Sequence, residues 1–437
     1  MPREIVVGLH FYQPPREAFH PSLTHISTDP KKENWTAIID KQCYEPLSQL
    51  GLLNKVSFDI YQSLLLQMEK LDPSAAIIFK QSMKENGIGE AFIHPILPDL
   101  SRIDKQIVIS AGVNRFCEIT GDRPKTFWPP ETAIDTDTLE VLAENGYESF
   151  VCAAEQIIQN DGSRSDNQPT LILLPSGRRI VALPFDRPLS SDLANKPKDN
   201  ADQFTQQFVV NEVKKFPESQ PIIAWTDGET FGHHYPFGDL FLDYFLSSSL
   251  PNIGLYPVSI NSLKFDPGTL PIGKINERTA WSCPHGNLSR WHGLCQCDNY
   301  YGNWKPGFQI AFNNLNQSVS QILLREIGPD YSDLVASSFY LHYSHPETIN
   351  NPAKALIAAK ISSLVSLTSC ATFFASPETS GKINLLYGYQ TILYLHESGL
   401  TQEAEKLNGQ LINDLSQISF PGYQRSAADA LSEMLGG

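Results

Sequence analysis

The segment 225–234 concentrates side chains that can exchange protons or bind a metal: Asp227, Glu229, His233 and His234. An apolar run, 221–225, leads into it and predicts a short buried strand. Two glycines in the segment let the backbone turn where the strand gives way to a loop. Acids and imidazoles at a strand end favour proton transfer or metal binding. The simplest alternative is a solvated turn whose acids only accept hydrogen bonds from loop amides.

Polar residues also follow earlier apolar runs, and they are His10, Tyr12, Gln13, His94 and Glu131. In a barrel of parallel strands, functional groups gather at the C-terminal ends of the strands. Glu131 and Asp227 are then two carboxylates from different strands, as glycoside cleavage needs. One attacks the anomeric carbon or activates water, and the other protonates the departing oxygen. Two alternatives stay open: Glu131 could cap the following helix, and His10 could be a hydrogen-bonded core residue.

Short apolar runs alternate with helical patterns over most of the chain's first part. The runs that predict strands are 5–10, 56–60, 89–94, 125–128, 149–152, 170–174, 179–185 and 221–225. The patterns that predict helices are 61–71, 102–120, 137–146 and 202–216. Turn residues at 176–177 favour a hairpin between the sixth and seventh runs. Strands that alternate with helices favour a parallel sheet, most economically a (β/α) barrel.

The character of the sequence changes after about residue 275. Residues 276–307 are rich in Trp, Cys, His, Gly and Asn, and the pattern from Phe308 onward is helical almost to the end. We therefore predict an α/β catalytic barrel over 1–275, and a loop region with a helical domain over 276–437.

Composition limits the partners and the compartment. The 437 residues carry a net charge of −15, which argues against a nucleic-acid partner, because binding phosphates needs a basic surface. We see no signal peptide and no uncharged apolar run of membrane-spanning length. Seven cysteines without a secretory signal fit a reducing compartment, so we expect a cytoplasmic protein with no membrane partner.

A second cluster of chemically active residues lies in the loop region, and its possible ligands are Cys283, His285, Cys295 and Cys297. Tetrahedral zinc accepts such ligands, but the C-x-H and C-x-C spacings are tighter than the usual gaps of two to four residues. Zinc, a packed loop with free thiols and an active-site lid are the three interpretations. We favour the lid, which would present Trp281, His285 and Trp291 to a sugar, and we expect no metal or other cofactor.

Several of these segments resemble the ordered conserved regions of family 57 of the glycoside hydrolases. The segments are 10–15, 94–95, 128–131 and 227–234, and the resemblance covers at least residues 5–235. Three further segments, 128–133, 281–286 and 368–370, are similar to a bacterial subgroup of that family. The resemblance implies a distorted (β/α)7 barrel followed by a C-terminal helical lobe. It also implies activity on α-glucans, as in amylases, 4-α-glucanotransferases and branching enzymes.

The resemblance assigns roles to individual residues. Glu131 matches the catalytic nucleophile and Asp227 the general acid/base. His10, Gln13, His94 and His234 match or neighbour the substrate-contacting positions of the family. We add six residues to the predicted substrate-binding set, and they are Tyr12, Trp128, Glu229, Trp281, His285 and Trp291. Tyr12 departs from the family pattern, since a second histidine is common there; tyrosine can hydrogen-bond a hydroxyl but carries no charge near neutral pH. Trp128 lies in an apolar run, so core packing is as consistent with the sequence as stacking on a sugar ring.

The interpretation is a retaining glycoside hydrolase or transglycosylase whose partner is an oligo- or polysaccharide. A metal-dependent carbohydrate deacetylase is the first alternative, but it needs an Asp with two histidines at the barrel mouth, and no Asp-Asp or His-x-x-x-His pair follows a predicted strand. A carbohydrate-binding protein without catalysis is the second alternative, against which both carboxylates count.

Overall fold

The computed structural model describes residues 3–28, 34–160, 162, 167–283, 285, 287–296, 302–377, 381–420 and 425–436. The chain forms two compact units. The barrel unit comprises Met1–Gln13, Asn34–Glu90 and Arg115–Trp281, and the helical unit comprises Pro14–Glu33, Ala91–Asn114 and Ser282–Gly437. The predicted domains, 1–275 and 276–437, are each contiguous. They place the segments Pro14–Glu33 and Ala91–Asn114 in the barrel rather than in the helical unit.

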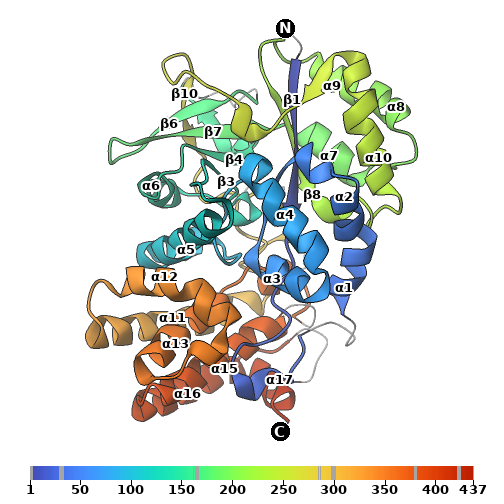
Figure 1. Cartoon of the computed structure of the whole chain (residues 1–437). Coiled ribbons are helices and arrows are strands. Elements are labelled where there is room, and N and C mark those ends of the chain that lie inside the picture. The colour runs from blue at the N-terminus through green and yellow to red at the C-terminus, as the bar shows by residue number, and fades with distance from the viewer. Residues whose placement is uncertain are drawn as a thin grey trace. The chain divides into compact units, whose positions relative to one another are not determined.

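The first sheet of the barrel unit is built around β1 (Arg3–Phe11), which lies beside β8 (Figure 1). β1 pairs in parallel with β2 (Ser57–Ile60), with β8 (Ile222–Asp227) and, near its start, with β9 (Leu255–Pro257). Residues 5–11 of β1 are all buried. A strand covered on both faces reads as a continuous apolar run, which explains why the sequence predicts this strand well.

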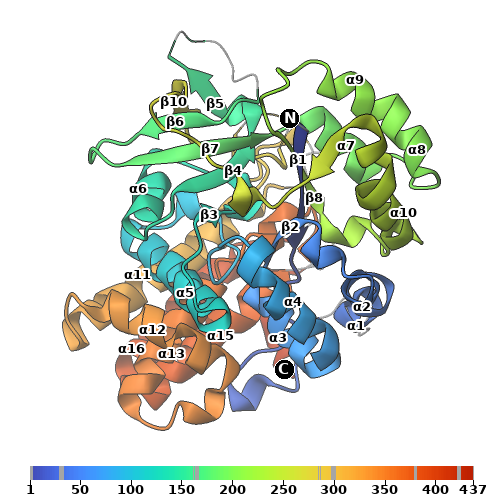
Figure 2. The same cartoon turned by 45° about the horizontal axis from the view of Figure 1, so that its top comes forward.

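The second sheet has six strands in the order β3-β4-β7-β6-β10-β5. They are β3 (Thr126–Phe127), β4 (Ser149–Ala153), β7 (Arg179–Phe185), β6 (Thr170–Leu173), β10 (Ile272–Ile275) and β5 (Ile157–Gln159). β3, β4 and β7 are mutually parallel, whereas β6 runs antiparallel to β7 and forms the predicted hairpin. Figure 2 shows β6, β7 and β10 together at one side of this unit.

Residues 87–89 join the two sheets. The Ile88 amide donates to the Phe58 carbonyl over 2.8 Å, and the Gly89 amide donates to the Thr126 carbonyl over 2.8 Å. On the other side, the Asp186 amide donates to the Ile223 carbonyl over 2.7 Å. The ring therefore runs β8, β1, β2, 87–89, β3, β4 and β7, which is the expected distorted (β/α)7 barrel. The predicted strand 89–94 is wrong, because only single bridges form at Gly87 and Gly89 and residues 91–94 belong to the helical unit.

Helices flank the strands of the barrel unit. They are α1 (Trp35–Ile39), α2 (Glu45–Gln49), α3 (Gln62–Leu71), α4 (Pro73–Asn86), α6 (Thr136–Glu144), α7 (Arg187–Asn195), α8 (Ala201–Phe204), α9 (Val210–Val213) and α10 (Gly238–Tyr244). Aspartates begin three of them, because a side-chain carboxylate satisfies an amide of the first turn. Asp135, for example, accepts from the Thr138 amide over 2.7 Å. Helix α5 (Arg102–Thr120) has the predicted bounds.

The helical unit contains α11 (Lys305–Glu326), α12 (Tyr331–Ser344), α13 (Pro352–Val365), α14 (Cys370–Phe373), α15 (Gly381–Glu397), α16 (Thr401–Ser416) and α17 (Ala427–Met434). Their orange-to-red ribbons lie together in both views (Figures 1 and 2). Lys360 is buried on α13, and its Nζ donates to Asp104 Oδ1 and Asn316 Oδ1, each over 2.6 Å. This pairing compensates the burial of its charge. No helix in the described part of the chain is long and apolar enough to span a bilayer.

Side chains alternate across β1, as they must in any strand. Ile5, Val7, Leu9 and Phe11 face the core that includes α3 and α4, whereas Val6 faces the barrel interior. Gly8 has the parity of Val6, and a Cβ placed there would lie 2.0 Å from the Trp225 ring. The indole therefore occupies the space that a side chain at position 8 would need.

We expect Gly8→Ala to lower the free energy of unfolding by about 1–3 kcal/mol, because the added methyl group displaces a buried ring. Denaturant unfolding measures the change. Gly409→Ala is the matched control, since position 409 lies within α16 and a methyl group there would meet no neighbouring heavy atom within 4 Å. The control should leave stability unchanged or raise it by about 0.5–1 kcal/mol. Equal effects of the two substitutions would contradict the steric argument.

Candidate active site

Strand alternation brings three ionisable side chains into the barrel interior. His10 pairs in register with Asp59 of β2 on one side and with Asp227 of β8 on the other. Their outward neighbours, such as Leu9 and Phe58, pack on the helices. All three side chains lie toward the C-terminal ends of parallel strands, where a barrel places its functional groups.

His10 and Asp59 form a buried ion pair. The Nδ1 atom of His10 lies 2.6 Å from Oδ2 of Asp59, and the two residues are 8% and 1% exposed. Burial disfavours the imidazolium, but Asp59 and the nearby charges of Asp227 and Glu229 outweigh it and raise the pKa of His10 to about 9. Burial also raises the pKa of Asp59, although the charge of His10 lowers it. The short distance is typical of a charge-assisted bond, so we assign the pair as imidazolium and carboxylate.

Glu229 lies in the short helical turn Gly228–Thr230 after β8 and is 6% exposed. Tyr44 donates its hydroxyl proton to Glu229 Oε1 over 2.6 Å, and Gln13 Nε2 lies 3.5 Å from the same oxygen. Burial, with the repulsion of Asp227, raises the pKa of Glu229 to about 7 despite the Tyr44 bond. Glu229 can therefore hold or release a proton near neutral pH beside Asp227.

Glu131 lies on a strained turn after β3. It has φ 57° and ψ 16°, and Thr132 has φ 50°. Residues other than glycine rarely adopt this left-handed backbone conformation, which costs on the order of 1–3 kcal/mol per residue in strain. Three hydrogen bonds hold the turn: the Trp281 amide donates to Thr132 Oγ1 over 2.8 Å and to the Glu131 carbonyl over 3.3 Å, and Gln156 Nε2 donates to the Thr132 carbonyl over 2.8 Å. The Glu131 side chain is half-buried on this turn.

Stacked rings inside the barrel connect the strand ends that carry the two carboxylates. Trp128 of the β3 exit stacks on Trp225 of β8 with ring centroids 5.2 Å apart and planes 19° apart. Trp128 also stacks on His10 at 5.2 Å. Glu131 follows Trp128 by three positions, and Asp227 follows Trp225 by two. The stack therefore fixes the distance between the two backbone segments from which Glu131 and Asp227 project.

The family of the chain follows from its sequence and agrees with this geometry. Residues 11–260 match the model of Glycosyl hydrolase family 57, which is more than half of the 437 residues. The chain belongs to glycosyl hydrolase family 57. No curated protein matches it.

Solved structures of family 57 and related proteins share the fold at low identity. An exo-type maltose-forming amylase from Pyrococcus sp. ST04 has 17% identity and a TM-score of 0.76, with 99% of this chain and 88% of that one covered. A GH57-type branching enzyme from Pyrococcus horikoshii has 14% identity and a TM-score of 0.64, with 100% and 95% covered. The α-amylase AmyC from Thermotoga maritima has 14% identity and a TM-score of 0.59, with 100% and 99% covered. These similarities confirm the predicted fold class.

Several substrate-contact predictions for this family 57 chain fall on accessible residues of the barrel unit. Tyr12, Gln13 and Trp281 are half-buried, and Asp227 and His234 are exposed. Tyr12 packs its ring edge on Tyr61 with centroids 5.3 Å apart, and Trp281 packs edge-on against Trp128 at 5.4 Å. Their sugar contacts stay predictions.

Two aromatic predictions need correction. Trp128 and Trp291 were both expected to contact sugar, yet each is 0% exposed. The stack with Trp225 and His10 covers Trp128, and Trp291 lies in the helical unit with its ring 6.2 Å from that of Phe373. An apolar run with a tryptophan does not reveal which way the ring turns. Trp128 therefore positions its neighbours, and Trp291 contributes to a core.

Two predicted histidines belong to the helical unit. His94 is 2% exposed, and its Nδ1 lies 2.8 Å from Ser369 Oγ. His285 is exposed and lies beside Cys283 and Cys295. Their roles in sugar binding stay predictions.

The sequence analysis missed Asp59, Tyr44 and Glu90. Asp59 interrupts the apolar run 56–60 at an inward position, and this was the available signal. Glu90 is buried, and burial with the charge of Asp59 raises its pKa well above the usual range. Burial and the charges of Glu90, Asp59 and Glu131 raise the pKa of Tyr61 as well. The interior of the barrel therefore holds more acidic groups than the motifs revealed.

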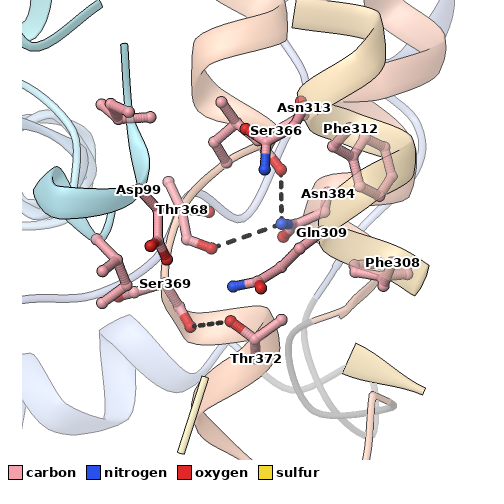
Figure 3. A pocket seen from close by; sticks show the side chains of 13 residues that line it. Asp99, Phe308, Gln309, Phe312, Asn313, Ser366, Thr368, Ser369, Thr372 and Asn384 are labelled. Carbon is pink, nitrogen blue, oxygen red and sulfur yellow. Dashed lines mark hydrogen bonds between the residues drawn. The ribbon is translucent and has the colours of Figure 1, made fainter. Parts of the chain in front are cut away.

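A cavity of about 30 Å³ lies in the helical unit among α11, α15 and residues 366–372 (Figure 3). The Asn384 side chain donates to the Ser366 carbonyl over 2.6 Å beside it. That volume suits about one water molecule, so the cavity is too small for a sugar.

Possible metal ligands cluster elsewhere. Within the described residues, one group of three or more potential metal ligands is found, and it consists of Cys283, His285 and Cys295 in the helical unit. Cys297, the fourth ligand considered, lies outside the described residues.

We expect the free energy of unfolding to fall as the pH rises from 6.5 to about 9, because folded His10 retains a proton that the unfolded chain releases. The stabilisation is complete below pH 6.5 and is lost by about pH 9, with an upper limit on the order of 3 kcal/mol. Denaturant unfolding of the wild type and His10→Gln across this range measures it. The variant should lose this part of the pH dependence, whereas His345→Gln, at an exposed site, should keep it. Parallel curves for wild type and His10→Gln would contradict the assignment.

Proposed function

We propose that the chain is a retaining glycoside hydrolase or transglycosylase acting on α-glucans, with Glu131 as nucleophile and Asp227 as general acid/base. The observation that carries the proposal is the pair of carboxylates at the exits of β3 and β8, on segments joined by the Trp128–Trp225 stack, in a member of family 57. The names of the structural neighbours, two amylases and a branching enzyme, support α-glucan as the substrate class.

Glu131 is suited to attack. Its turn lies at the exit of a barrel strand, and the Trp281 and Gln156 bonds restrain the backbone beneath the carboxylate. A nucleophile held in place loses little freedom as the bond to the anomeric carbon forms. In a retaining enzyme the two carboxyl groups are about 5–5.5 Å apart, and we propose that spacing for Glu131 and Asp227 when substrate is bound.

Asp227 is suited to proton transfer. It is exposed at the end of β8, next to the His10 imidazolium and close to Glu229. Asp227 protonates the leaving oxygen as the bond to the anomeric carbon breaks. Water then attacks the glycosyl ester with Asp227 as base, or a sugar hydroxyl attacks and the glycosyl group is transferred. His10, Gln13, Tyr12 and His234 are the proposed hydroxyl-binding residues of this unit.

The deacetylase alternative has less support. It needs an Asp and two histidines converging on one metal, and among the described residues the barrel interior has one histidine, His10, already paired with Asp59. A non-catalytic binding protein is distinguished by assay.

We also propose a cytoplasmic location. Within the described residues, Cys43, Cys117, Cys152 and Cys283 form no disulfide. Free thiols persist in reducing compartments.

The test is a product assay on a panel of α- and β-glucans with the wild type, Glu131→Gln and the exposed control Glu148→Gln. We expect wild type and control to shorten or rearrange α-glucans and Glu131→Gln to lose at least about 10³-fold in kcat. A slow fluorinated glucosyl substrate should leave a sugar on the peptide that contains Glu131. Full activity of Glu131→Gln, or a label on another peptide, would refute the assignment of Glu131 as nucleophile. Products with longer glucan chains than the substrate would indicate transfer rather than hydrolysis.

We expect Asp227→Asn to lose about 10²–10⁴-fold in kcat/KM on natural glucans, because their leaving group needs a proton. The loss should be much smaller for formation of the glycosyl-enzyme from a glucosyl fluoride, whose leaving group needs none. Azide, which needs no general base, should restore turnover and yield a glycosyl azide. Asp243→Asn, whose exposed carboxylate pairs with Lys55, is the control. Equal losses on both substrates, without azide rescue, would make Asp227 a structural residue.

A further inference from the structure

Three soft ligand atoms converge in the helical unit. Cys283 Sγ lies 3.5 Å from Cys295 Sγ, Cys295 Sγ lies 3.1 Å from His285 Nδ1, and Cys283 Sγ lies 3.9 Å from His285 Nδ1. The two cysteines are buried and the histidine is exposed. The cluster therefore has a buried thiol side and one imidazole at the surface.

These separations fit a single tetrahedral ion. With Zn–S bonds of about 2.3 Å and Zn–N bonds of about 2.0–2.1 Å, tetrahedral angles place two sulfurs about 3.8 Å apart and a sulfur and a nitrogen about 3.6 Å apart. Each observed distance is within about 0.5 Å of the corresponding value. The three atoms need only small movements to bind one ion.

The spacing that argued against zinc in the sequence is less restrictive in three dimensions. Cys283 and His285 are the only close pair used, and Cys295 reaches them from twelve positions later. Arg290 restrains the intervening loop, because its guanidinium donates to the Ser282 carbonyl over 3.1 Å and to the Phe373 carbonyl over 3.1 Å. The guanidinium also lies 3.7 Å from the centroid of the Phe373 ring. The ligands are thus held by a packed loop rather than by a strained short one.

We propose that Cys283, His285 and Cys295 bind Zn²⁺ as a structural site of the helical unit, with a fourth donor completing the tetrahedron. Thiolate and imidazole ligands select zinc over hard cations such as Mg²⁺ and Ca²⁺. The ion ties the start of the segment Ser282–Gly437 to the loop that carries the buried Trp291. This replaces the lid predicted from the sequence with a metal-stabilised loop.

A disulfide is the competing product of the same two thiols. Its sulfurs would have to approach from 3.5 Å to about 2.0 Å. His285 Nδ1 lies 3.1 Å from one sulfur, and this favours a metal, because zinc binds imidazole as well as thiolate whereas a disulfide joins only the two sulfurs.

The test uses the full-length protein, purified without chelator and freed of any affinity tag. Elemental analysis should find about one zinc per chain in the wild type. Cys283→Ser and Cys295→Ser should abolish retention, and His285→Asn should weaken zinc affinity at least about tenfold. Cobalt added to metal-free protein should give thiolate-to-cobalt absorption that Cys283→Ser removes. Chelation should lower the melting temperature of the wild type and leave that of Cys283→Ser unchanged.

Two variants control for unrelated effects. Cys117→Ser removes a free thiol in α5, and His345→Asn removes an exposed histidine of the helical unit; both should keep the zinc. His285→Asn changes an exposed residue, so it reports on the site even if the cysteine variants fold poorly. Three results would each overturn the proposal: metal-free wild type that takes up no zinc, a Cys283–Cys295 disulfide in the purified protein, or full zinc retention by Cys283→Ser, Cys295→Ser and His285→Asn.

Discussion

The packing of three rings inside the barrel is the constraint on which the site depends. Trp225, Trp128 and His10 stack in one layer, and the lack of a side chain at Gly8 gives the first indole its space. Neither indole nitrogen of the two tryptophans has a hydrogen-bond partner within the described residues, so the layer is held by apolar contact rather than by polar bonds. Rings packed to crystal-like density leave the strand ends little freedom. The stacked rings thereby restrain the backbone segments that carry Glu131 and Asp227.

Strain and charge are concentrated around that layer. Consecutive left-handed residues at Glu131 and Thr132 are tolerated because Trp281 and Gln156 hold the turn. The His10–Asp59 pair places a cation in the barrel beside the carboxylates of Asp227 and Glu229. Backbone strain and buried charge each oppose folding, and both persist when the surrounding packing over-determines them. The core next to the proposed site therefore holds both the strained turn and the buried charges in place.

The spacing of apolar residues and the sequence motifs predicted many of the strands and helices and the candidate carboxylates. The features that the sequence analysis missed depend on how segments are oriented in space. Continuous apolar runs identified β1, β2 and β8, and helical periodicity gave the bounds of α5, because burial on both faces and 3.6-residue spacing are local signals. The segment 89–94 misled, since only Gly89 and Glu90 belong to the barrel unit, whereas the apolar residues 91–93 belong to the helical unit. Asp59 went unnoticed because its inward direction depends on register with β1. The linear spacing of Cys283, His285 and Cys295 likewise did not show that their ligand atoms lie close together, because sequence gaps do not reveal how a loop folds back.

The helical unit recruits its first segment from near the start of the chain, where Ala18, Leu23 and Ile26 pack with Leu386. During synthesis at about 5–20 residues per second, the roughly 360 positions between Leu23 and Leu386 take on the order of 20–70 s to be made. Throughout that interval, these three apolar side chains lack the partner against which they pack. The nascent chain thus carries an unfinished surface until α15 emerges. A fragment that lacks either the early segment or α15 leaves that surface open, so a single cut between the barrel and the later helices cannot separate two finished units.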